Sequence, residues 1–97
     1  MALSAFAIAD TSRYEILLPA QTHAGATLLA PGQYVVEVDG SRAIFTNVMT
    51  GHSFAAPVKV ETTKPHEATA IQVGKQGRRH FLKSIDLAGS DETLEFK

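Results

Sequence analysis

LLAPGQYVVEVDGSRAIF, residues Leu28–Phe45, decides the fold class of this chain. Pro31-Gly32 favours a type II turn, because proline presets φ at the first central position and glycine accepts a positive φ at the second. Apolar side chains then recur with a period of two along Gln33–Val38, which predicts a strand with one buried face. Asp39-Gly40 is a two-residue hairpin signal, and a second strand follows it. The stretch therefore predicts a β-hairpin in a small β domain.

Composition limits the size and chemistry of that domain. The 97 residues carry a net charge of −1, with a hydrophobic content of 44% and no cysteine. A chain of this length forms one domain with a single modest core. The near-zero net charge supplies no field to attract nucleic acid or an acidic membrane. The lack of cysteine excludes disulfides, thiolate nucleophiles and cysteine-based zinc sites.

The first residues bear on where the protein works. Residues 1–9, MALSAFAIA, are small and apolar and precede Asp10. Small residues end a secretory signal, so we interpret residues 1–9 as a signal remnant, with a flexible or strand-adding N-terminus as the alternative. Residues 10–97 are expected to form a single β domain that is periplasmic or secreted. No stretch approaches the ~20 apolar residues of a transmembrane helix, so no transmembrane segment is expected.

The rest of the chain reads as further short strands between turn signals. We expect an all-β fold, a single small antiparallel sandwich or barrel of about six to eight strands. Pro57 cannot donate a ladder hydrogen bond, so its strand is expected to be an edge or bulged there. The glycines of Gly74–Gly77 predict a four-residue hairpin loop. The predicted strands outside the opening stretch are Arg13–Leu18, Ser53–Thr62, Ala68–Val73, Arg79–Leu87 and Glu92–Phe96.

The alternation along these strands also predicts which side chains form the core. A domain of this size needs nearly all of its large apolar side chains inside, at roughly 1.5–3 kcal/mol for each one fully buried. The expected core residues are Tyr14, Ile16, Leu18, Tyr34, Val36, Val38, Phe45, Phe54, Val58, Val60, Ile71, Val73, Phe81, Ile85, Leu87, Leu94 and Phe96.

The order of these signals resembles a family of small exported bacterial all-β domains with an L-x-P-G-x-Y-x-V turn–strand motif. The motifs that carry the resemblance are Ala9-Asp10, Tyr14–Leu18, Gly25–Val36, Ala43–Phe45, Pro57–Glu61, Ile85–Gly89 and Leu94–Phe96. Alanine stands at Ala88, where the family usually has glycine. The resemblance covers almost the whole chain and implies export and an all-β fold. It carries over no catalytic residues.

Histidines are the obvious candidates for a site. The four histidines lie in or beside predicted loops, except that one opens a strand, and no two are spaced to share a face. Solvated loop histidines are therefore the favoured interpretation. A periplasmic metal site could still use His52, Met49 and His66, and a small hydrolase could use His23, His52 and His66. No cofactor is expected.

A second candidate lies on the strand Arg79–Leu87. His80, Ser84 and Asp86 share one predicted face with Leu82, but His80 and Ser84 are about 13 Å apart at ~3.3 Å per residue. A catalytic triad within this strand alone therefore fails on distance. Lys83 interrupts the opposite, buried face, so it is expected near an edge or reaching to solvent.

Charge is the last feature of this region. A basic run, Lys75 to Lys83, precedes an acidic end, Asp86 to Glu95. Pairing of Arg79–Leu87 with Glu92–Phe96 would partly neutralise the two signs, whereas unneutralised cations would suit an anionic or polysaccharide ligand. Nucleic acid is not an expected partner, because aromatic side chains are not interleaved with the cations. We expect a non-catalytic binding or structural/assembly module that self-associates, or captures another protein, through an edge strand such as the Pro57 strand or the terminal strand.

Overall fold

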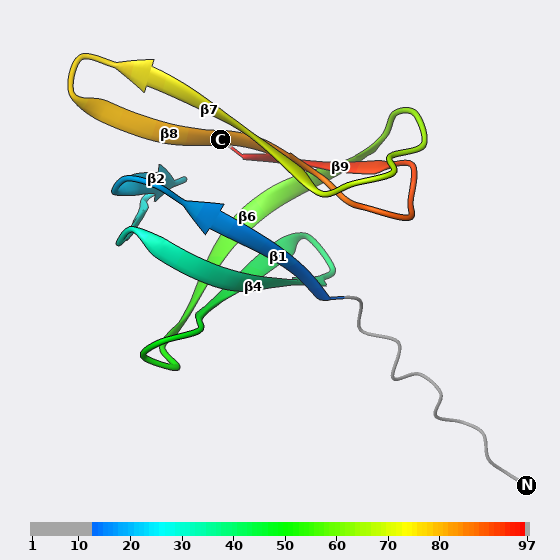
Figure 1. The fold of residues 1–97 in the computed structure, drawn as a ribbon. Helices are drawn as coiled ribbons and strands as arrows, with labels where there is room; N and C mark the ends of the chain where they lie inside the picture. The colour runs from blue at the N-terminus through cyan, green and yellow to red at the C-terminus, as the bar shows by residue number, and fades with distance from the viewer. Residues whose placement is uncertain (1–12, 97) are drawn as a thin grey trace, which may run out of the picture.

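The computed structural model describes residues 13–96, and all of its regular elements are strands, as predicted (Figure 1). The strand count is higher than the predicted range of about six to eight, because the connection after the first strand contains a short extra hairpin, β2 and β3. The part of the chain described contains no helix long and apolar enough to cross a membrane. The nine strands are β1 (Arg13–Leu18), β2 (Thr22–Ala24), β3 (Thr27–Leu29), β4 (Gly32–Asp39), β5 (Arg42–Asn47), β6 (Ser53–Thr62), β7 (Ala70–Gln76), β8 (Arg79–Asp86) and β9 (Glu92–Phe96).

Two layers share one strand. The first layer is β1-β4-β5-β6 and the second is β6-β9-β8-β7, and β6 crosses between them (Figure 1). β6 pairs with β5 up to Pro57 and with β9 from Val58 onward. Pro57 thus marks the change of partner, and among the described strands Ser53–Pro57 pairs only with β5, which matches the expected edge. β2 lies parallel to β8 at its first half, and β3 pairs with β2.

The terminal strand differs from its prediction. β9 was expected to offer an exposed edge for a partner, but it lies between β6 and β8 and pairs with both. The reason is that the hairpin joining β8 to β9 folds β9 inward, where Leu94 is fully buried. Within residues 13–96, β1 and β7 each pair with one strand only and are the long edges of the two layers.

The core fills the space between the layers. Most of the predicted core residues are buried or pack against the buried cluster, and Tyr34 and Phe45 are its largest members. Val60 and Val73 were predicted to be buried but are 37% and 40% exposed. Val73 lies on β7, which pairs only with β8 within the described residues. The buried hydrophobic residues that the predicted core omitted are Ala24, Leu29, Ala43, Ala56 and Leu82.

A β-bulge explains the error at Leu82. Gln72 faces Ser84 and Val73 faces Leu82, so Lys83 is an extra residue in β8. A bulge reverses the alternation on one side of it. Leu82 therefore points inward, as Ile85 does, and the predicted shared face of His80, Leu82, Ser84 and Asp86 is wrong. Lys83 itself is exposed, as expected.

The β4–β5 and β7–β8 hairpin turns are each shorter or later than predicted. β7 and β8 are joined by Gly77-Arg78 rather than by a loop spanning Gly74–Gly77, and β4 and β5 are joined by Gly40-Ser41. Gly77 has φ 62° and Gly40 has φ 63°. Glycine with a positive φ at the first central position is the mark of a type II′ hairpin, whose twist suits the flanking strands. Gly74 has no such φ and continues β7 as a strand residue opposite Phe81.

Candidate functional site

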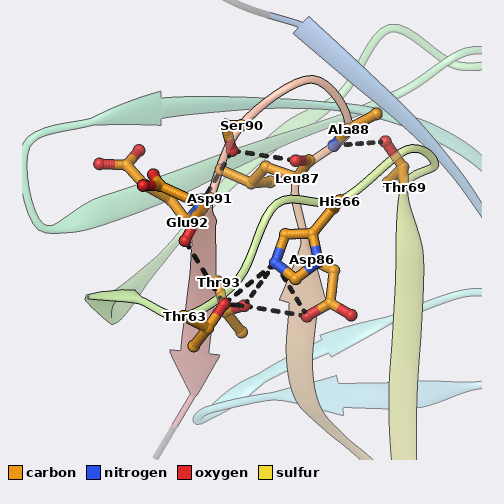
Figure 2. Close-up of polar contacts among 10 residues, drawn as sticks. All are labelled: Thr63, His66, Thr69, Asp86, Leu87, Ala88, Ser90, Asp91, Glu92 and Thr93. Carbon is orange, nitrogen blue, oxygen red and sulfur yellow. Dashed lines mark hydrogen bonds and ion pairs between the residues drawn. The ribbon is translucent and has the colours of Figure 1, made fainter.

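Backbone hydrogen bonds join the β6–β7 connection to the β8–β9 turn. Figure 2 shows these two segments side by side. The amide of Thr63 donates to the carbonyl of Asp91 over 2.7 Å, and the amide of His66 donates to the carbonyl of Ser90 over 2.9 Å. The amide of Gly89 donates in return to the carbonyl of His66 over 2.9 Å. These bonds fix the backbone of His66 on both sides, so its ring is held at a defined place over the sheet.

The ring of His66 forms a polar cluster with side chains from three strand ends, as Figure 2 shows. Its Nε2 lies 3.1 Å from the hydroxyl oxygens of both Thr63 and Thr93, and 3.8 Å from Oδ1 of Asp86. Thr93 donates its hydroxyl proton to Asp86 Oδ1 over 2.9 Å. The His66 side chain is only 8% exposed. We call Thr63, His66, Asp86 and Thr93 the His66 cluster.

The geometry of the His66 cluster suits a structural role, in which it holds the β6–β7 connection against the sheet. Nucleophilic catalysis needs a base that is oriented through its second ring nitrogen by an acid, and a reachable hydroxyl. Here the carboxylate and both hydroxyls meet the same nitrogen, Nε2, and Thr93 is 6% exposed. Thr93 also donates its hydroxyl proton to Asp86 rather than to the imidazole. The cluster thus satisfies buried polar groups and joins the loop to the sheet.

The outer face of the second layer carries a carboxylate pair beside a lysine. Lys59 Nζ lies 3.1 Å from Oε2 of Glu61. This hydrogen bond lowers the pKa of Glu61 and raises the pKa of Lys59. Hydrogen bonding with Glu61 raises the pKa of Glu95, because the neutral form of Glu95 can donate a proton to its neighbour.

The residues proposed for a metal site are not brought together. Met49 is 86% exposed in the β5–β6 turn, and His52 lies immediately before the first residue of β6. His66 follows the other end of β6, whose ten residues span about 30 Å. In residues 13–96 no group of three or more histidine or carboxylate side chains is placed to hold a metal ion. The hydrolase set is dispersed as well: His23 stacks on Phe81, near the start of β8, with ring centroids 5.6 Å apart, whereas His66 lies beside Asp86 at the end of β8.

The unpaired side of β7 is the candidate interaction edge. β7 pairs with β8 along its whole length, and no strand within the described residues pairs with its other side. Val73, the middle residue of this seven-residue strand, is 40% exposed. The two ends of β7 differ in charge, because Ala70 faces Asp86 whereas Gln76 faces Arg79.

Comparisons with known proteins add no assignment: no family model, no curated protein and no solved structure matches the chain. The kinship with exported β domains stays a prediction. Sequence reasoning favoured His66 as a solvated loop histidine and kept it as a candidate metal or hydrolase residue, since nothing local indicates that the loop folds back onto Thr93. It found β7 as a strand but could not place it at an edge, because strand order depends on the whole topology.

Proposed function

We propose that this protein is a non-catalytic assembly module that self-associates through the unpaired edge of β7. The observation that carries the proposal is a seven-residue strand with one row of backbone donors and acceptors unused within the described structure. Such a row is a template for another strand. The proposed partner is a second copy of the chain, joined antiparallel so that the two sheets become continuous.

A two-fold axis at Val73 gives the best register. Pairs across the axis then join Val73 with Val73, Gln72 with Gly74, and Lys75 with Ile71 of the second copy. The two half-exposed valines bury each other, and no lysine faces a lysine. Lysines commonly protect an edge strand from pairing, but in this register Lys75 lies beside an aliphatic side chain. The pairing is isologous, as closed dimers require.

Charge favours the antiparallel orientation. The basic end of one copy, at Arg79, lies in the same row as the acidic end of the other, at Asp86. The two are separated by three strand spacings, about 14 Å. That exceeds the Debye length of about 10 Å at 0.1 M salt. Backbone bonds and the valine contact therefore supply most of the affinity, and the charges add to it at low salt.

Sedimentation equilibrium of the wild-type chain and two variants tests the proposal. Val73→Lys places like charges together at the two-fold axis and is expected to weaken the dimer at least about tenfold. Val48→Lys is the matched control, because Val48 is 52% exposed in the β5–β6 turn, away from β7. A wild-type chain that stays monomeric at millimolar concentration would refute the proposal. A dimer that survives Val73→Lys but is lost in Leu17→Lys would assign the interface to β1 instead.

The proposed location is the periplasm or the exterior of the cell. It is supported by the composition of residues 1–9, which lie outside the described residues, and by the resemblance to exported β domains. An edge-mediated assembly needs no disulfide and so suits a chain without cysteine.

A further inference from the structure

The end of the β7–β8 hairpin gathers positive charge that the rest of the structure does not neutralise. β8 pairs with β9 only from Ser84 to Asp86, so the acidic residues of β9 lie away from the hairpin end. The expected pairing of these strands is therefore present but does not reach the hairpin end. No ion pair within residues 13–96 joins any of the hairpin's four cations to a carboxylate. These cations are Lys75, Arg78, Arg79 and Lys83.

A pocket opens beside two of these cations. It holds about 250 Å³ between the hairpin end and the β2–β3 hairpin. At about 30 Å³ per water molecule, this is room for roughly eight waters, or for one oxyanion and part of the group that bears it. The residues lining this hairpin pocket are Ala20, Gln21, His23, Leu28, Arg78, Arg79 and His80.

The parallel pairing of β2 with β8 builds the pocket. His23 pairs with Phe81, and its ring stacks on the phenyl ring at an interplanar angle of 29°. Because the strands run in the same direction, Gln21 comes beside Arg79 and Ala20 beside Arg78. The type II′ turn at Gly77-Arg78 places Arg78 at the tip. β7 flanks β8 on the other side, so a partner on the β7 edge leaves the pocket open.

The lining groups are donors suited to an oxyanion. Each guanidinium presents a planar fork of N–H groups that matches carboxylate or phosphate oxygens. His23 and His80 each carry a ring N–H in either neutral tautomer, and Gln21 has an amide NH₂. Two guanidiniums favour a dianion over a monoanion, and Leu28, which is 45% exposed, offers an apolar wall to the remainder of a ligand.

We propose that the hairpin pocket binds a phosphate monoester, with the phosphoryl group between Arg78 and Arg79. This site goes beyond the assembly function and does not depend on it. The phosphoryl group could be carried by a small metabolite or by a lipid headgroup, and the chemistry of the pocket is the same for both.

Amide chemical-shift titration of the full chain with inorganic phosphate tests the site. We expect saturable shifts confined to Gln21, His23 and the hairpin end, and weaker binding of acetate at equal ionic strength. Arg78→Gln/Arg79→Gln should weaken phosphate binding at least about tenfold. Arg13→Gln/Arg42→Gln is the control. It removes the same charge from two exposed arginines in the other layer and should change binding less than about twofold.

Further arms separate the sources and the two proposals. Tighter binding of a sugar monophosphate than of inorganic phosphate would identify a small metabolite as the carrier of the phosphoryl group. Binding to vesicles that contain phosphatidic acid would identify a lipid headgroup instead. Val73→Lys should keep phosphate binding even though it dissociates the dimer. Equal losses in the two double variants would overturn the site, since net charge alone would then explain binding. Shifts that never saturate would overturn it too.

Discussion

His66 is the residue that most clearly joins a loop to the body of the molecule. Its Nε2 lies 3.1 Å from both threonine hydroxyls, which its removal would leave with fewer partners. We expect His66→Ala to lower the free energy of unfolding by about 1–3 kcal/mol, the usual cost of unsatisfied buried polar groups. His52→Ala, which alters an exposed histidine, should change it by less than about 0.5 kcal/mol. Urea denaturation measures the free energy of unfolding of both variants. Equal effects would show that the His66 cluster does not stabilise the attachment of the loop.

Glu95 gives the fold a pH dependence with a definite sign. Its pKa in the folded state is raised above the ordinary 4.5 by hydrogen bonding with Glu61. Its stabilising contribution is therefore present below about pH 4.5 and is lost as the pH rises through the folded-state pKa. In Glu95→Gln the amide can donate to Glu61 at every pH. Relative to wild type, the variant should gain stability between pH 4 and pH 7 in urea denaturation. Glu92→Gln, on the same strand, is the control, and the same gain there would contradict the assignment to the carboxylate pair.

At the scale of one strand, the bulge at Lys83 leads to an unusual expectation for a deletion. Removing one residue from a regular strand turns its apolar side chains to the wrong face. Removing Lys83 instead leaves Leu82 and Ile85 separated by Ser84 alone, which is regular in–out–in alternation. We expect the Lys83 deletion to fold with a well-dispersed NMR spectrum. Deletion of Thr46 from the regular strand β5 should unfold the chain, because Phe45 and Asn47 could not both stay inside. An unfolded Lys83 deletion would mean that the bulge is needed for pairing with β2.

The same strand shows how far sequence reasoning reaches. Local alternation predicted β4, β5 and the first part of β6 well, because their one buried face repeats every second residue there. It failed across Lys83, because one extra residue in a β-bulge reverses the alternation, and the amino-acid sequence does not indicate where the bulge lies. It also missed Ala24 and Ala43, whose burial depends on how closely the layers approach. Likewise, the His66 cluster and the hairpin pocket each join residues far apart in the chain, so no local spacing could indicate them.

For the whole molecule, the shared strand β6 makes the two layers one unit. It pairs with β5 at one end and β9 at the other, and the buried cluster is continuous from Val36 and Phe45 to Ile85 and Leu94. Neither layer can therefore open without exposing the core of the other, which predicts a single cooperative transition.

Native-state hydrogen exchange tests this unity. The slowest amides of β4 and β5 should share one opening free energy with those of β9 and the second half of β8, while amides at the hairpin end near Gly77 exchange faster. Val58→Ala truncates a side chain that is 6% exposed in the shared strand. It should lower the opening free energies of both groups of amides equally, by about 1–3 kcal/mol. Leu17→Ala, at a site 65% exposed on the outer strand β1, should leave both opening free energies nearly unchanged. Two separate opening free energies, with only one of them responding to Val58→Ala, would show that the layers are independent and that β6 merely connects them.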